Sequence, residues 1–248
     1  MQVLDVLERI KDNSLQTYEH SVRVGNLTFL LALSLNMPAE ESDRMKMAGY
    51  LHDVGKNAIW DIVESDINFN EVSAEERNLF YKKLEKHVYF DSFLKDCEDV
   101  EPEYIDAIHY HHNKYNGEGY SKDSVEAQDK SLNLEGDKIP KVAQLICIVD
   151  IYDALRNPRS YKEPYSLEKT MDIMKEELSA GHFNPQYAKT FLDKVIPAWE
   201  KMTEKEKLTL NPKKDEAVAK IKKASEHEHK NRRPQELHNK ESIDTPSR

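Results

Sequence analysis

The sequence is organised around the stretch Tyr50-Leu51-His52-Asp53-Val54-Gly55-Lys56. Residues 38–51 predict a helix, because a proline suits its first turn, acidic residues follow and apolar residues recur at helical spacing. Gly55 predicts the end of that helix, since glycine accepts the left-handed conformation that ends many helices. His52 and Asp53 therefore lie where the helix ends, and there neighbouring side chains can converge on one site.

The two residue types suggest a metal site. Imidazole and carboxylate both bind first-row metal ions, and the two oxygens of Asp53 can bridge two ions. Lys56 adds a positive charge beside them. The alternative is a helix C-terminus at which a histidine interacts favourably with the helix dipole, and the pair alone does not exclude it. Ligand-type residues elsewhere in the chain decide between the two.

Composition indicates the fold class and limits the function. The 248 residues include only seven glycines and show little alternation of apolar and polar positions, which predicts an all-α helical bundle. The net charge of −10 argues against binding to DNA or RNA polymers. A small anionic substrate would need a local basic pocket on such an acidic protein.

Cysteine usage and hydropathy predict a cytoplasmic protein. Cys147 lies in an apolar run and Cys97 is the only other cysteine, so we expect buried free thiols in a reducing compartment. The most apolar run, residues 27–35, is far shorter than the roughly 20 residues that span a bilayer, and no membrane insertion is expected.

The C-terminal region differs in character from the rest. Residues 200–248 hold 13 basic and 10 acidic residues, which leaves this region at +3 and the body at −13. We expect a domain over residues 1–198 and a charged extension over 199–248, disordered from about residue 226. Such an extension is a candidate binding site for a protein partner.

Three predicted helices carry further ligand-type residues. His20 lies on the apolar stripe of the helix over residues 16–36, although a hydrogen-bonded core histidine is the alternative. A capping box at Ser73 opens a helix that we expect to reach about residue 96, with His87 on its inner face. The helix over residues 103–112 ends at His111 and His112, which repeats the arrangement of His52 and Asp53.

Asp150 is embedded in the most apolar segment, the predicted central helix over residues 141–155. An unpaired carboxylate there would cost several kcal/mol, so it must find a cation or strong donors, with a salt bridge as the alternative. Seven inward donors on five helices are too many for one metal ion and suit two. The two ions of such sites lie about 3.5–4 Å apart. The seven are His20, His52, Asp53, His87, His111, His112 and Asp150.

Together these segments resemble the HD-GYP subgroup of the HD-domain phosphohydrolases, from about residue 18 to residue 192. His52-Asp53-Val54-Gly55-Lys56 is similar to the HDxGK motif, and residues 111–121 are similar to HHExxDGxGYP. The aspartate helix around Asp150 and the RPYK-like residues 159–162 follow in the same order. A late turn, residues 181–185, resembles GxxFDP.

The resemblance implies an HD-domain helical bundle with two or three iron or manganese ions. It implies hydrolysis of a cyclic dinucleotide, chiefly cyclic di-GMP, by attack of a metal-bridging hydroxide on phosphorus. Asp53 and Lys56 would be catalytic. The residues that would contact the substrate are Lys56, Tyr120, Arg159 and Lys162.

Three positions depart from the motifs. Gln16 stands where members with a third metal carry glutamate, and its neutral amide is a poor ligand, so we expect two divalent ions. Asn113 replaces the glutamate of HHE, and Ser121 replaces the proline of GYP. The sequence therefore does not identify the nucleobase of the substrate. Hydrolysis of another nucleotide or phosphate ester is a second interpretation. A non-catalytic signalling adapter is a third, although an adapter has no need of seven convergent ligands.

Overall fold

The computed structural model describes residues 1–59, 72–119, 133–158, 163–210 and 218–219, and within these ranges the protein contains helices and no strand. The prediction of an all-α fold is therefore confirmed. The α-helices are α1 (Val3–Asn13), α2 (Leu15–Ser34), α3 (Ala39–Leu51), α5 (Ala74–Leu84), α6 (Pro102–Tyr110), α8 (Lys141–Arg156), α9 (Leu167–Ser179), α10 (Pro185–Thr190), α11 (Ile196–Trp199) and α12 (Glu204–Leu208).

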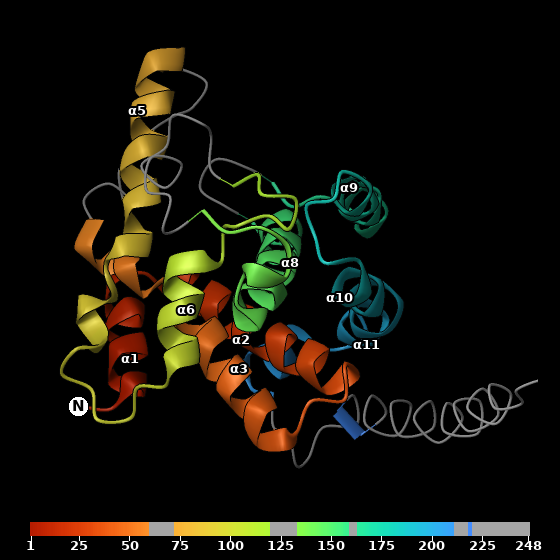
Figure 1. Cartoon of the computed structure of the whole chain (residues 1–248), viewed down its shortest axis with the longest axis horizontal. Helices are drawn as coiled ribbons and strands as arrows, with labels where there is room; N and C mark the ends of the chain where they lie inside the picture. Colours follow the sequence, from red (N-terminus) through yellow and green to blue (C-terminus); the bar gives the residue numbers. More distant parts are fainter. Residues whose placement is uncertain (60–71, 120–132, 159–162, 211–217, 220–248) are drawn as a thin grey trace, which may run out of the picture.

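Helix α2 lies at the centre of the bundle. It packs against α1, α3 and α8, and every residue from His20 to Ser34 is buried. Figure 1 shows α3 and α8 beside it, with α9, α10 and α11 grouped on one side. A helix that is apolar around most of its circumference becomes a core element, and α2 and α8 both have this character. The two helices bring His20 and Asp150 into the interior.

Hydrogen bonds of side chains define two helix starts, and the predicted capping box at Ser73 is confirmed. Ser73 and Glu76 form a reciprocal capping box at the start of α5. Asn184 accepts hydrogen bonds from the backbone N–H groups of Gln186 and Tyr187, at the start of α10. Each cap satisfies backbone donors that have no partner inside the helix.

The helix that begins after Ser73 does not extend to residue 96, and that prediction was wrong. Helix α5 ends at Leu84, and the chain continues as two short 3₁₀ helices, η2 (Glu85–Tyr89) and η3 (Asp91–Leu94). No residue of α5 is buried, and Figure 1 shows this helix projecting from the bundle. The tighter 3₁₀ turn buries His87 and Val88 against the core, which a continued α-helix would have directed elsewhere.

The role of Gly55 also differs from the prediction. Helix α3 ends at Leu51 with His52 in a right-handed conformation, and Gly55 lies within the 3₁₀ helix η1 (Val54–Ile59) rather than in a left-handed turn. A Cβ atom on Gly55 would lie 1.9 Å from the carbonyl oxygen of His87. Glycine is required here because two backbones touch.

The packed part of the chain continues beyond residue 198. Helix α10 continues through a π-helical turn, η5 (Phe191–Val195), into α11. Leu210 and Val218 are buried in the core, and Asn26 donates a hydrogen bond to the carbonyl of Lys207 at 2.7 Å. Residues 220–248 lie outside the described residues, so the domain boundary and a protein-binding role for the extension stay predictions. Among the described helices, none is both long and apolar enough to cross a membrane.

Candidate metal centre

The structure brings all seven predicted donor side chains together. Each of three overlapping groups has donor atoms within 4.8 Å of one another: His87, His111 and His112; His20, His52 and Asp150; and His52, Asp53 and His111. They come from α2, the end of α3, η2, the end of α6, and α8. Segments far apart in the sequence thus form one buried cluster.

Asp53 is at the centre of this cluster. Its Oδ1 lies 3.3 Å from Nε2 of His87, and its Oδ2 lies 3.4 Å from Nε2 of His52 and 3.6 Å from Nε2 of His20. The two oxygens face different histidines, as a bridging ligand requires. Lys56 forms an ion pair with Oδ2, so the predicted positive charge does lie beside the carboxylate.

The histidine rings are oriented by their other nitrogen. In three of them Nδ1 lies within hydrogen-bond distance of a backbone carbonyl, which accepts only, so Nδ1 carries the proton. These acceptors are the carbonyls of Gly49 for His52 (2.8 Å), Leu84 for His87 (2.7 Å) and Ala107 for His111 (2.7 Å). The three Nε2 atoms therefore present lone pairs to the centre of the cluster, as metal-ligating histidines do.

Several of the nitrogen atoms that face the centre of the cluster lie against one another. The Nε2 atom of His87 lies 3.3 Å from Nε2 of His111 and 3.3 Å from Nε2 of His112. The Nε2 atom of His52 is buried without a hydrogen-bond partner. Adjacent lone pairs repel one another unless a cation lies between them, and buried polar atoms are normally satisfied. The residues therefore fit divalent metal ions.

Electrostatics keep the donors in the protonation states that metal binding needs. Burial lowers the pKa of His87 to about 4 and that of His111 to about 3, so both rings are neutral at neutral pH. Burial alone would raise the pKa of Asp53, but Lys56 and the surrounding histidines hold it well below its usual range. Neutral imidazoles and an ionised carboxylate are the forms that bind metal.

Sequence reasoning missed one buried residue that orients a donor. Asp153 lies one turn after Asp150 on α8, and its Oδ2 lies 2.7 Å from Nδ1 of His20. Its other oxygen accepts a hydrogen bond from Nε of Arg23 at 2.8 Å. The spacing held a signal, since Asp153 follows Asp150 by three residues as Arg23 follows His20, and both pairs therefore share helix faces.

The structure does not describe all predicted site residues. Tyr120, Arg159 and Lys162 lie outside the described residues, and their roles stay predictions. Gln16, at the predicted third-metal position, is exposed, and its amide donates a hydrogen bond to the carbonyl of Pro158 at 2.7 Å. Asn113 is buried directly after His112.

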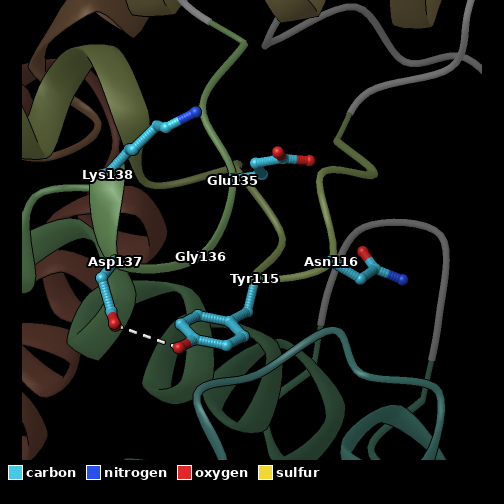
Figure 2. A pocket seen from close by; sticks show the side chains of 6 residues that line it. All are labelled: Tyr115, Asn116, Glu135, Gly136, Asp137 and Lys138. Atoms are coloured by element: carbon cyan, nitrogen blue, oxygen red, sulfur yellow. Dashed lines mark hydrogen bonds between the residues drawn. The ribbon is translucent and has the colours of Figure 1, made fainter.

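An open cavity of about 520 Å³ lies beyond the two adjacent histidines, where the chain leaves α6. Figure 2 shows it between two segments, with the Tyr115 hydroxyl donating to Oδ1 of Asp137 at 3.0 Å. None of the seven donors lines it. The lining residues are Tyr115, Asn116, Glu135, Gly136, Asp137 and Lys138.

Fold and site together define a helical domain built around a histidine–aspartate centre for divalent metal. The chain belongs to the HD domain family, whose model matches residues 5–187. In the solved structure of the HD domain of L. monocytogenes phosphodiesterase PgpH in complex with cyclic-di-AMP, the same fold recurs with a TM-score of 0.55 at 20% identity. That likeness covers 79% of this chain and 95% of the other.

Sequence relatives agree with the resemblance to the HD-GYP subgroup. A cyclic di-GMP phosphodiesterase of Pseudomonas aeruginosa is 29% identical over 189 residues, which cover 76% of this chain and 42% of the relative. A 3′3′-cGAMP-specific phosphodiesterase of Vibrio cholerae is 30% identical over 194 residues, which cover 77% of this chain and 34% of the relative. The chain therefore spans well under half the length of these relatives.

Proposed function

We propose that this protein is a metal-dependent phosphodiesterase that hydrolyses a cyclic dinucleotide, with cyclic di-GMP as the first candidate. The observation that carries the proposal is the convergence of five histidines and two aspartates beside Lys56. Family membership and relatives named for cyclic di-GMP and cGAMP support it.

The proposed cofactor is two divalent ions, iron or manganese. The seven donors supply enough nitrogen and oxygen ligands for two ions, and histidine-rich sites with carboxylates suit these metals. Bound ions would polarise a phosphate oxygen and lower the pKa of a water molecule. Gln16 donates its amide to Pro158 rather than offering a carboxylate, which supports two ions rather than three.

The residues of the chain divide into three roles in this proposal. Asp53 would help to hold both ions, since its two oxygens face different histidines. Lys56 neutralises the carboxylate and places a cation at the edge of the cluster for a substrate phosphate. Tyr120, Arg159 and Lys162 are proposed to contact the substrate, on the basis of the motif resemblance alone.

A second substrate has support of its own. The relative named for 3′3′-cGAMP is as similar to this chain as the relative named for cyclic di-GMP. Ser121 in place of the motif proline leaves the base preference open between guanine and adenine. Both substrates contain the same phosphodiester, so the proposed chemistry is unchanged.

The test is a hydrolysis assay with purified full-length protein loaded anaerobically with iron or manganese. The panel contains cyclic di-GMP, 3′3′-cGAMP, cyclic di-AMP and mononucleotide phosphate esters, and products are separated by chromatography. We expect hydrolysis of at least one cyclic dinucleotide and none after metal chelation. Turnover of mononucleotide esters alone would replace the proposal with a different phosphohydrolase, and metal loading without any turnover would favour the adapter.

A further inference from the structure

A second polar cluster lies outside the metal centre, around His182 in the turn between α9 and α10. Both nitrogens of its ring face carboxylates: Nδ1 lies 2.7 Å from Oε2 of Glu177, and Nε2 lies 2.9 Å from Oε2 of Glu118. Nζ of Lys114 lies 3.4 Å from the same oxygen of Glu177. The His182 side chain is only 15% exposed, so these contacts are partly shielded from water.

His182 joins three charged side chains through its two ring nitrogens. An ionised carboxylate only accepts hydrogen bonds, so a ring nitrogen that binds one must donate. Nδ1 also lies 3.0 Å from Nζ of Lys114. The ring therefore links Glu177 of α9 to Lys114 and Glu118.

The segment held by His182 is the 113–119 loop, which leaves the metal centre directly after His112. Lys114 and Glu118 both belong to it, so the side chain of His182 holds the loop from the turn after α9. The backbone adds to this grip, because the Tyr115 N–H donates to the His182 carbonyl at 2.8 Å. On its other side the loop is held by the Gly136 N–H, which donates to the Tyr115 carbonyl at 2.8 Å.

The loop connects the metal donors to the open cavity of Figure 2. Its first residue, Asn113, is buried and directly follows His112, whereas Tyr115 and Asn116 line the cavity. Displacement of the loop would therefore change the cavity lining while His87 and His111 stay fixed by their own carbonyl contacts. The position of the 113–119 loop should affect the binding of a large substrate more than the binding of a small one.

We propose that His182 is a positioning residue that holds the 113–119 loop in place to receive the substrate. This inference rests on the proposed function, because it assigns the loop to binding the body of the dinucleotide rather than to the reaction at phosphorus. Misplacement of a binding group by about 1 Å can cost on the order of 100-fold in rate. Among the described residues, the side chain of His182 contacts Lys114, Glu118 and Glu177, none of which is a proposed metal donor.

The test compares His182→Ala and His182→Gln with the wild type on two substrates. For cyclic di-GMP or the preferred dinucleotide, we expect His182→Ala to lower kcat/KM roughly 10- to 100-fold, mainly through KM. For bis(4-nitrophenyl) phosphate, a small diester, we expect kcat/KM to stay unchanged, with full metal content. His182→Gln keeps a donor toward Glu118 and should recover part of the loss.

Hydrogen exchange gives a readout that needs no substrate. In His182→Ala, peptides that cover the 113–119 loop should exchange faster, while peptides of α2 stay unchanged. Arg44→Ala is the matched control, since it removes another partly shielded ion pair, 3.1 Å from Glu103, and does not touch the loop. It should change neither exchange in the loop nor KM.

Two results would overturn the inference. Unchanged exchange of the loop in His182→Ala would show that His182 does not hold it. An equal loss on both substrates, or loss of metal, would show a general structural role instead. Failure of the wild type to cleave any cyclic dinucleotide would overturn the proposed function separately, and the exchange experiment would still decide whether His182 holds the loop.

Discussion

Oδ2 of Asp153 lies 2.7 Å from Nδ1 of His20, on the ring nitrogen opposite the one that faces the metal centre. Nε2 of the same ring lies 3.1 Å from Oδ1 of Asp150. Two aspartates one turn apart on α8 thus hold the two nitrogens of one imidazole. A carboxylate behind a ligand histidine fixes the ring and raises its basicity, so we expect Asp153 to strengthen metal binding through His20.

Asp153→Asn should weaken metal binding about 10- to 100-fold with a smaller loss of stability, because the amide keeps the shape of the carboxylate without its charge. Asp153→Ala should also destabilise the protein by about 3–5 kcal/mol, because it leaves the buried guanidinium of Arg23 without its main partner. Metal titration and denaturant unfolding measure the two effects. Asp193→Asn on the exposed face of η5 is the control. Equal metal affinity in Asp153→Asn and the wild type would contradict this role.

Asp53→Ala should abolish turnover and reduce the metal content, because the carboxylate faces histidines on both of its oxygens. The variant also leaves Lys56 without its ion-pair partner. Elemental analysis and the dinucleotide assay on the same preparation measure both effects. Wild-type turnover at full metal loading would refute Asp53 as the bridging ligand.

Anaerobic loading should give about two metal equivalents per chain, since the seven donors suit a dinuclear site. Gln16→Glu should raise the count toward three, because it places a carboxylate one turn before His20. The same change removes the amide that donates to Pro158, so Gln16→Ala separates the loss of that bond from the gain of a ligand. Three tightly held ions in the wild type would contradict the dinuclear assignment.

The metal-free protein should lose stability as the pH falls below 6.5. The pKa of His87 is about 4 in the folded protein and 6.5 when unperturbed, because burial disfavours the charged ring. The unfolded chain therefore binds the proton first, and stability is lost between pH 6.5 and 4 with a slope of about 1.4 kcal/mol per pH unit for each such histidine. The pKa of His111 is about 3 in the folded protein, so this histidine extends the loss of stability to lower pH. Denaturant unfolding of chelator-treated protein across this range measures the slope, and a flat profile would show that the rings are already charged when folded.

Arg159→Ala and Lys162→Ala should keep the metal and lose roughly 30- to 1000-fold in kcat/KM, or about 2–4 kcal/mol of transition-state stabilisation. The motif resemblance assigns both to the substrate phosphates, and an acidic chain needs cations close to a bound anion. Lys189→Ala, on an exposed ion pair of α10, is the control. Wild-type efficiency in both variants would remove them from the site.

The sequence predicted those parts of the fold and site that depend on local pattern. Apolar spacing located α2 and α8 and directed His20 and Asp150 inward, and the capping box at Ser73 located the start of α5. The convergence of six donors followed from their placement on the inner faces of helices and at helix ends, whereas His87 reaches the cluster from the 3₁₀ helix η2. Their role as metal ligands stays a prediction.

Features set by contacts between distant segments were not predictable in this way. The end of α5 at Leu84 depends on the packing of His87 and Val88 against the core, which local periodicity does not encode. Gly55 was interpreted as a helix stop because its real constraint, the carbonyl of His87, lies on another segment. The cluster of His182 likewise joins residues 64 positions apart in the sequence.

The pairing of His20 with Asp153 has a consequence for the timing of metal loading in the cell. The two residues are 133 positions apart, and His52, His87 and His111 all lie between them. At a synthesis rate of about 5–20 residues per second, roughly 7 to 27 seconds pass between the emergence of the first donor and that of its supporting carboxylate. All five histidines of the cluster therefore emerge before the two aspartates of α8. The complete set of proposed donors can form only after α8 has been made and has packed against α2.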